Sequence, residues 1–168
     1  MTAKISKEQI VDAAKKFVSD YYTLADLKGI TRAELEAVYS LGFAHYRTGH
    51  YEEASKLFQF LVLFDHLNTK YWTAMGAVQQ VAKDYQGAVT SYAYASFLDL
   101  HNPKPQFHAA ECFLAMGDKA NAASSLLALE QYCPKDTDAG REYRAKAAAL
   151  RKQIGEEAFA EEKSEKAV

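Results

Sequence analysis

The chain has 168 residues, 49% of them hydrophobic and 25% charged, which fits one compact soluble domain with a sizeable core. A formal net charge of −2 argues against a general nucleic-acid binder, which needs surplus Lys and Arg to neutralise phosphates. With only 8 Gly and 3 Pro, the composition favours helices over a turn-rich sheet protein.

The N-terminal nine residues are polar and contain no apolar segment of the kind that a signal peptide needs. The most apolar run, residues 58–64, is interrupted by Gln59 and ends at Asp65, so it is too short to span a bilayer. Cys112 and Cys133 follow no disulfide spacing pattern, which favours a reducing compartment. We therefore predict a cytoplasmic protein without stable membrane insertion.

Residues 1–30 are predicted to form an N-terminal helical segment. Ser6 and Gln9 have the spacing of a capping box, which would begin a helix that ends near Asp20. Apolar residues recur along it at helical spacing. This stripe could pack back onto the first repeat or serve as a dimer contact, and we expect the dimer contact. The stripe consists of Ile10, Val11, Ala14, Phe17 and Val18.

A 34-residue repeat, the period of tetratricopeptide proteins, organises the centre of the chain. Gly42 and Gly76 are 34 residues apart, and the same spacing separates Ala54, Ala88 and Ala122. Each copy has a small residue in its first helix, a turn, a small residue in its second helix, and a large apolar residue four positions later. The large residues are Phe58, Tyr92 and Leu126, and the copies are 35–68, 69–102 and 103–136.

The small residues mark the points where the two helices of a copy cross. Helices approach closely only where no bulky side chain intervenes, and the large apolar residue fills the adjoining hole. A single helix pair cannot cover its own apolar face, so the copies must stack. Chance periodicity is the alternative, but several independent positions agree in all three copies. We predict an all-α fold of three tandem tetratricopeptide hairpins, forming a superhelix with flanking helices at both ends.

Two further elements complete the predicted fold. Thr31 and Glu34 form a capping-box pattern that opens the first copy. Residues 137–158 are rich in Ala, Lys and Arg and are predicted to form a helix that caps the last repeat. Residues 159–168 are predicted to be an acidic flexible tail.

The first helices of a repeat superhelix line its concave face, usually with their second, fifth, ninth, twelfth and thirteenth residues. Here these positions combine apolar pockets, small residues that leave room for a ligand backbone, and polar groups that can bind that backbone. Burying one large apolar ligand side chain contributes about 1.5–3 kcal/mol, so three of them give about micromolar affinity after the ordering cost. The predicted peptide-binding groove consists of Tyr39, Phe43, Tyr46, Arg47, Lys70, Thr73, Ala77, Gln80, Lys104, Phe107, Glu111 and Leu114.

Individual aromatic residues of this set could instead pack against one another and against the flanking helices. For the set as a whole, a binding site is favoured, because a concave face lined with apolar surface normally marks one.

No nucleophile elbow, phosphate loop or paired-carboxylate motif is present in the sequence, so we predict no enzyme and no cofactor. His108 and Cys112 are four residues apart and share a helix face, but zinc takes four ligands, or three and a water. No third His or Cys has suitable spacing. We therefore predict no metal site, with Cys112 as a buried small hydrophobe and His108 as a packing or rim residue.

A repeat adaptor that grips acidic C-terminal tails is an alternative. That clamp needs Lys and Asn at the fifth and ninth positions of the first copy, where this chain has Tyr39 and Phe43. It needs Asn where Ala74 stands, and Lys then Arg where the third copy has Lys104 then His108. Four of these five positions fail, so this clamp is disfavoured, while an adaptor for another peptide partner stays open.

Several segments resemble the class II translocator chaperones of bacterial type III secretion, the kind represented by SycD, LcrH and IpgC. The resemblance covers about residues 20–135. Residues 22–27 resemble the lead-in to the first repeat and residues 57–66 its exit, while Tyr71, Trp72 and residues 75–77 fit the second repeat. Residues 105–118, PQFHAAECFLAMGD, resemble the third-repeat block and are the most specific part.

This resemblance implies a bacterial cytosolic chaperone that holds an extended segment of hydrophobic translocator proteins in its concave groove. Such chaperones keep translocators soluble and apart before export. Members often dimerise through the N-terminal region, so a homodimer is expected for the free protein, and some members also serve a transcriptional regulator. Two features depart from the family pattern: residues 81–83 lack the glycine that many members place before the turn, and the tail beyond Glu156 has no counterpart.

Overall fold

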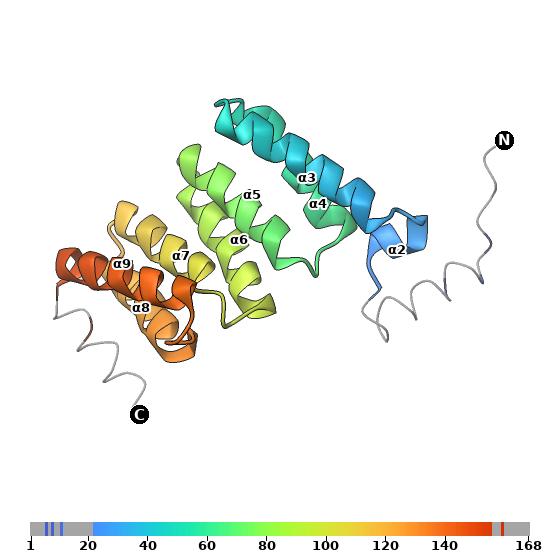
Figure 1. Cartoon of the computed structure of the whole chain (residues 1–168). Helices are drawn as coiled ribbons and strands as arrows, with labels where there is room; N and C mark the ends of the chain where they lie inside the picture. The colour runs from blue at the N-terminus through green and yellow to red at the C-terminus, as the bar shows by residue number, and fades with distance from the viewer. Residues whose placement is uncertain (1–5, 7, 9–10, 12–21, 156–158, 160–168) are drawn as a thin grey trace.

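The computed structural model describes Ser6, Glu8, Val11, residues 22–155 and Phe159. Within these residues the secondary structure is helical throughout, which confirms the predicted all-α fold class (Figure 1). The helices are α2 (Leu24–Lys28), α3 (Arg32–Arg47), α4 (Tyr51–Phe64), α5 (Thr69–Val81), α6 (Tyr85–Leu98), α7 (Pro103–Ala115), α8 (Lys119–Tyr132) and α9 (Asp138–Ile154).

Several predictions for the two ends of the chain lie outside the described residues. They are Gln9 of the predicted Ser6–Gln9 capping box, the dimer-contact residues Ile10, Ala14, Phe17 and Val18, and the acidic tail apart from Phe159. Val11, the one described member of the predicted dimer contact, is half exposed, at 50%.

The capping box at the start of α3 is present as predicted. The hydroxyl of Thr31 accepts a hydrogen bond from the backbone N–H of Glu34, and the Glu34 carboxylate accepts one from the backbone N–H of Thr31. Thr23 and Asp26 make the same reciprocal pair at the start of α2. Each pair satisfies amide groups that the first turn of a helix leaves without partners, so both helix starts are fixed by local sequence.

The three hairpins are α3 with α4, α5 with α6, and α7 with α8. Gly42 lies against the ring of Phe58 in the first hairpin, and Gly76 lies against the ring of Tyr92 in the second. Ala110 and Leu126 belong to the same buried cluster in the third. The residues predicted at the helix crossings are therefore buried, and the large apolar residue of each copy sits beside its crossing.

The turn within each hairpin has one residue in the left-handed region. Gly49 and Gly117 fill this position in the first and third hairpins, with φ of 82° and 80°. Lys83 fills it in the second, with φ of 64°. In all three turns the next residue donates its backbone N–H to a carbonyl five positions earlier, as Asp84 does to Gln79. The same backbone turn therefore forms whether or not a glycine is available to it.

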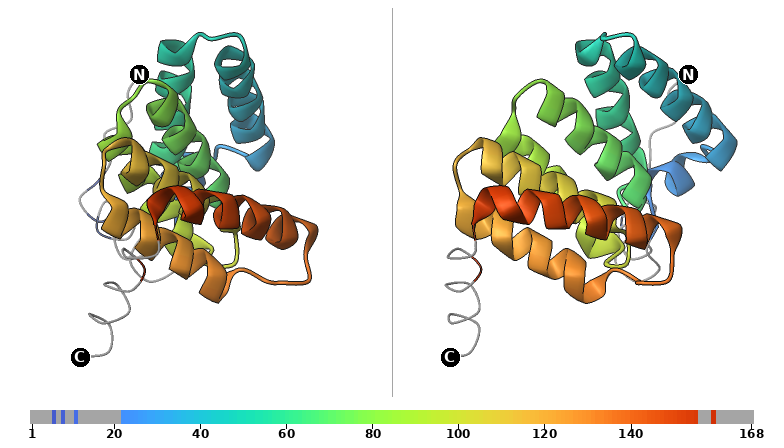
Figure 2. Two further views of the ribbon diagram at one scale, coloured as in Figure 1. Left: turned by 90° about the vertical axis from the view of Figure 1, so that its left-hand side faces the viewer. Right: turned by 60° about the vertical axis from the view of Figure 1, so that its left-hand side comes forward.

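The hairpins stack in chain order into a curved array (Figure 1). Helix α9 lies against α7 and α8 at the C-terminal end, which Figure 2 shows from two sides. Its buried face includes Tyr143, Ala147 and Ile154, which join α7 and α8 residues in one hydrophobic cluster. Helix α9 therefore covers the apolar surface that the last repeat would otherwise expose.

Candidate functional site

A groove of about 930 Å³ lies between α3 on one side and α5 and α7 on the other. Helix α2 and the link to α3 line one end, through Thr23, Ala25 and Ile30. Lys104, His108 and Tyr143 line the other end. The groove thus follows the first helices of the repeats, where the 34-residue period predicts the concave face.

Three aromatic rings from α3 form one wall. Tyr39, Phe43 and Tyr46 are spaced by four and three residues, so they share one helix face. The Phe43 ring centroid lies 6.2 Å from that of Tyr39 and 6.4 Å from that of Tyr46, and both pairs are stacked. Phe43 is 44% exposed. This wall offers a continuous aromatic surface to anything that enters the groove.

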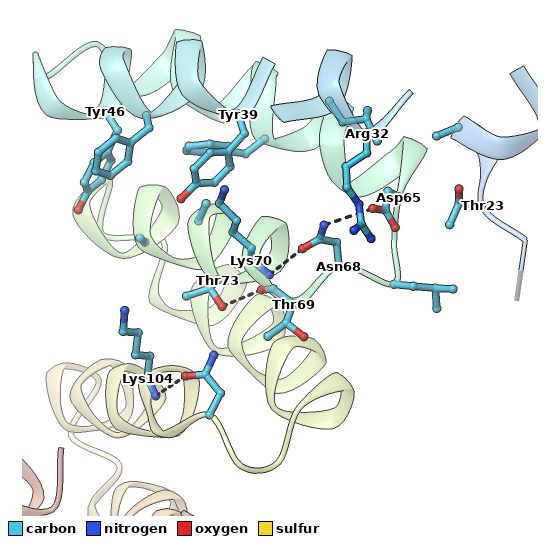
Figure 3. Close-up of a pocket in the computed structure, with 18 of the residues that line it drawn as sticks. Thr23, Arg32, Tyr39, Tyr46, Asp65, Asn68, Thr69, Lys70, Thr73 and Lys104 are labelled. Carbon is cyan, nitrogen blue, oxygen red and sulfur yellow. Dashed lines mark hydrogen bonds between the residues drawn. The ribbon is translucent and has the colours of Figure 1, made fainter. Parts of the chain in front are cut away.

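The two tyrosine hydroxyls give the apolar wall a polar edge. Figure 3 shows Tyr39 and Tyr46 pointing from α3 toward α5. Burial raises the pKa of both hydroxyls above the ordinary tyrosine value, so they stay neutral and can donate hydrogen bonds. A neutral aromatic wall with hydroxyl tips suits an apolar side chain attached to a polar backbone.

Lys70 crosses the groove from α5 to the α3 wall. Its Nζ lies 3.7 Å from the ring centroid of Tyr39 and 2.6 Å from Oε1 of Glu36. Glu36 and Lys70 occupy equivalent positions in successive repeats, 34 residues apart. This contact ties the two first helices together across the groove, and it places a cation beside the aromatic wall.

The α5 side of the groove combines small and polar residues. Ala74 and Ala77 line it without filling it, and the Thr73 hydroxyl donates to the carbonyl oxygen of Thr69 at 2.8 Å. Near the entrance to α5, the side-chain amide of Asn68 donates to the Asp65 carboxylate at 3.3 Å (Figure 3). The small residues opposite the aromatic wall leave room for the backbone of an extended chain.

A polar network lies at the α7 end. The Glu111 carboxylate oxygen Oε2 is 2.8 Å from Nδ1 of His108 and accepts a hydrogen bond from Gln80 at 3.2 Å. The Tyr92 hydroxyl donates to Gln80 Oε1 at 2.8 Å. Burial by itself would raise the pKa of Glu111, but the hydrogen bonds from His108 and Gln80 outweigh it and hold that pKa below its ordinary value. Glu111 is therefore ionised near neutral pH and fixes the positions of two side chains beside the groove.

Seven of the twelve predicted groove residues line this groove: Tyr39, Phe43, Tyr46, Lys70, Thr73, Ala77 and Lys104. Five do not. Arg47 is exposed beyond the groove, Gln80 serves the polar network, and Leu114 packs onto the C-terminal core. Phe107 and Glu111 instead line a smaller hollow between α7 and α9.

Phe107 is the clearest difference from the prediction. It is only 7% exposed, and its ring centroid lies 5.5 Å from that of Tyr143 in an edge-to-face pair. Helix α9 covers the α7 position that faces the groove in the other repeats. The alternative considered for individual aromatics, packing against a flanking helix, therefore describes Phe107, and the neighbouring His108 lines the groove instead.

The repeat pattern also missed residues that come from outside the first helices. Thr23, Ala25 and Asp26 of the α2 region and Tyr143 of α9 line the groove. No periodic signal marks them, because their position depends on how the two flanking segments pack against the repeats. The capping pair of Thr23 and Asp26 was a detectable local signal for the start of α2.

Cys112 is fully buried beside Tyr92, in agreement with its interpretation as a small hydrophobe. Burial raises the pKa of its thiol to about 12, so it is not a reactive thiolate near neutral pH. Within residues 22–155 and the few other described positions, no three His, Cys, Asp or Glu side chains gather where they could hold a metal ion. Nor does any helix in this part of the chain combine the length and hydropathy that a bilayer crossing requires.

The fold and the groove define a tetratricopeptide-repeat protein with an aromatic-lined concave face. The family profile described as tetratricopeptide repeat matches residues 35–68 and 69–102. The chain is 36% identical over 126 residues to low calcium response locus protein H of Yersinia pestis, covering 75% of each chain.

Two solved structures extend this similarity. The type III secretion chaperone SycD of Yersinia enterocolitica, in complex with a peptide of the translocator YopD, is 34% identical, with a TM-score of 0.69 over 74% of this chain and 95% of SycD. A chain of a type III secretion complex from Aeromonas hydrophila is 32% identical, with a TM-score of 0.79 over 85% of this chain and 95% of that one. The chain therefore belongs to the family of type III secretion translocator chaperones that includes these proteins.

Proposed function

We propose that this protein is a cytoplasmic chaperone that holds an extended segment of hydrophobic translocator proteins in its concave groove. It keeps them soluble and apart before their export through a type III secretion system. The single observation that carries the proposal is the wall formed by Tyr39, Phe43 and Tyr46 opposite the small residues Ala74 and Ala77. An extended chain can place apolar side chains on that wall while its backbone passes over the alanines.

The relatives support the choice of client. SycD has been crystallised with a peptide of the translocator YopD. The shared fold covers 95% of SycD and 74% of this chain. The groove volume of about 930 Å³ lies within the range of about 300–1,000 Å³ that ligand sites generally occupy. Burying two or three large apolar client side chains gives about micromolar affinity once the ordering cost is subtracted.

The free protein is proposed to be a homodimer that uses the apolar stripe of residues 10–18. Val11 of this stripe is half exposed, and burial against a second copy would remove that surface from water. Sedimentation of the full chain and of a version without residues 1–20 measures this directly. An unchanged mass after truncation would contradict the dimer contact.

Co-expression tests the chaperone function. The full chain is produced together with each hydrophobic translocator of its own secretion system, and the soluble, co-purified translocator is measured. Phe43→Arg puts a charge on the aromatic wall and is expected to abolish co-purification. Leu41→Arg is the matched control, because Leu41 is 52% exposed on the same helix and does not line the groove. Equal recovery with both variants, or insoluble translocator with the wild type, would overturn the proposal.

A further inference from the structure

A second hollow of about 410 Å³ lies between α7 and α9, on the same side of the repeats as the groove. Its α7 wall comprises Phe107, His108 and Glu111. Its α9 wall comprises Lys146, Ala149, Leu150 and Gln153.

The hollow continues the groove. His108 lines both, so the two spaces adjoin. On α7, Lys104, His108 and Glu111 follow one another on a single helix face, and the first two already belong to the groove. On α9, Tyr143 of the groove is three residues from Lys146 of the hollow, which is one helical turn. The same two helix faces therefore form the end of the groove and the walls of the hollow.

The floor of the hollow is apolar. Phe107 is buried, Leu150 is half-buried, and Ala149 is small and exposed, so it leaves space above them. This combination suits an aliphatic side chain that inserts between the two helices, where each buried apolar group is removed from water.

Each charged group at the rim already has a partner within the protein. Glu111 faces His108 and Gln80, and Lys146 is bound to Glu142 at 2.5 Å. A charged guest would have to compete with these pairs or lie unpaired beside an apolar floor, which is costly. The side-chain amide of Gln153 at the exposed end can both donate to and accept from a peptide backbone. The hollow therefore favours a neutral apolar residue within an extended chain.

We propose that the α7–α9 hollow is a second subsite of the groove, which receives one neutral aliphatic side chain from the same client segment. This proposal rests on the proposed function. From Tyr143 to Leu150 along α9 is about 10 Å, a distance that an extended chain covers in about three residues. The bound segment thus continues past Lys104, and its next apolar side chain enters between Phe107 and Leu150.

Photo-crosslinking from single positions tests where the client lies. Benzoylphenylalanine replaces Gln153 at the hollow, Lys104 at the end of the groove, or Lys152 as a control. Lys152 is exposed on α9 but does not line the hollow. Each full-length variant is co-expressed with the full-length translocators of its own secretion system, irradiated and digested. We expect position 153 to capture a translocator residue within about ten residues of the one captured from position 104, and position 152 to capture none.

The possible outcomes distinguish a failure of the second subsite from a failure of the proposed function. If position 104 captures translocator while position 153 captures none, or captures the chain's own residues 156–168, the second subsite is wrong and the chaperone function stands. If neither position captures translocator, the proposed function fails and the subsite with it.

A second variant pair measures the contribution of the hollow to binding. Ala149→Phe fills the space above Phe107 and Leu150, whereas Ala148→Phe adds the same ring at an exposed position outside the hollow. The dissociation constant of the translocator complex is expected to be about tenfold higher with Ala149→Phe than with Ala148→Phe. Matched helical content and melting temperature would show that both variants are folded. Equal dissociation constants in folded variants would overturn the second subsite.

Discussion

Gly76 lies directly against the ring of Tyr92: a Cβ atom added to this glycine would be 2.6 Å from Tyr92 Cε1 and 2.7 Å from Cδ1. The Tyr92 ring is buried and its hydroxyl is held by Gln80, so it cannot swing aside without breaking that hydrogen bond. The α5–α6 crossing is therefore closed to any side chain at position 76. Gly42 and Phe58 stand in the same relationship in the first hairpin, at 2.8 Å.

Replacing Gly76 by Ala is expected to destabilise the protein. Overpacking a close helix crossing typically costs about 1–3 kcal/mol, although alanine recovers part of that cost through its better helix propensity. For a chain of this size the melting temperature should fall by about 2–4 °C per kcal/mol. Calorimetry measures the shift. The double variant Gly76→Ala with Tyr92→Leu should lose less than the two single changes together, and strict additivity would contradict the proposed clash.

Replacing Lys83 by Gly is expected to stabilise the protein. Lys83 occupies a left-handed backbone conformation that costs a residue with a Cβ about 1–2 kcal/mol, and Gly49 and Gly117 fill the equivalent turns. Glycine loses more backbone entropy on folding, so the net gain should be about 0.5–1 kcal/mol. Urea denaturation measures it. Lys83→Ala is the control, and a gain of the same size with alanine would attribute the effect to the lost charge instead.

Replacing Phe43 by Ala is expected to weaken client binding while leaving the fold intact. Phe43 is partly exposed on the groove wall, and its truncation removes about 1.5 kcal/mol of apolar contact with the client, which corresponds to about tenfold in affinity. Titration of the purified translocator complex measures the dissociation constant, and circular dichroism checks the helical content. Leu41→Ala, on the same helix outside the groove, should bind as the wild type does.

Replacing Phe107 by Ala is expected to act on stability. The ring is buried between α7 and α9 against Tyr143, and truncation of a buried phenylalanine typically costs about 3–5 kcal/mol. Chemical denaturation of Phe107→Ala beside Phe43→Ala compares the two aromatic residues directly. If Phe107→Ala were folded and as stable as the wild type, α9 would not pack on α7 in this way.

Replacing Glu111 by Gln is expected to reduce the loss of stability in acid. The hydrogen bonds from His108 and Gln80 hold the pKa of Glu111 below its ordinary value in the folded state. This carboxylate therefore stabilises the fold above its unfolded pKa, near 4.5, and the contribution disappears as the pH falls through its folded pKa. Melting temperatures from pH 6 to pH 3 should fall less steeply for Glu111→Gln than for the wild type. Parallel curves would contradict this role.

Most of the fold could be predicted from local patterns. Thr31 and Glu34 predict the start of α3, because a capping box depends only on two residues three positions apart. Gly42 with Phe58, and Gly76 with Tyr92, indicated the crossings, because the two helices of a hairpin are joined by a short turn and their register follows from the sequence. The aromatic wall of α3 was also predictable, because the repeat period indicates which positions of a first helix face the groove.

The 34-residue repeat predicts three hairpins in a common register and a concave face lined by their first helices, because both features follow from a single period. The residues that close this face at its two ends depend instead on how the flanking helices pack against the repeats. Helix α9 covers Phe107 and brings Tyr143 beside His108, while α2 places Ala25 at the other end. These contacts join the repeats to segments that do not share their period, so no spacing along the chain encodes them.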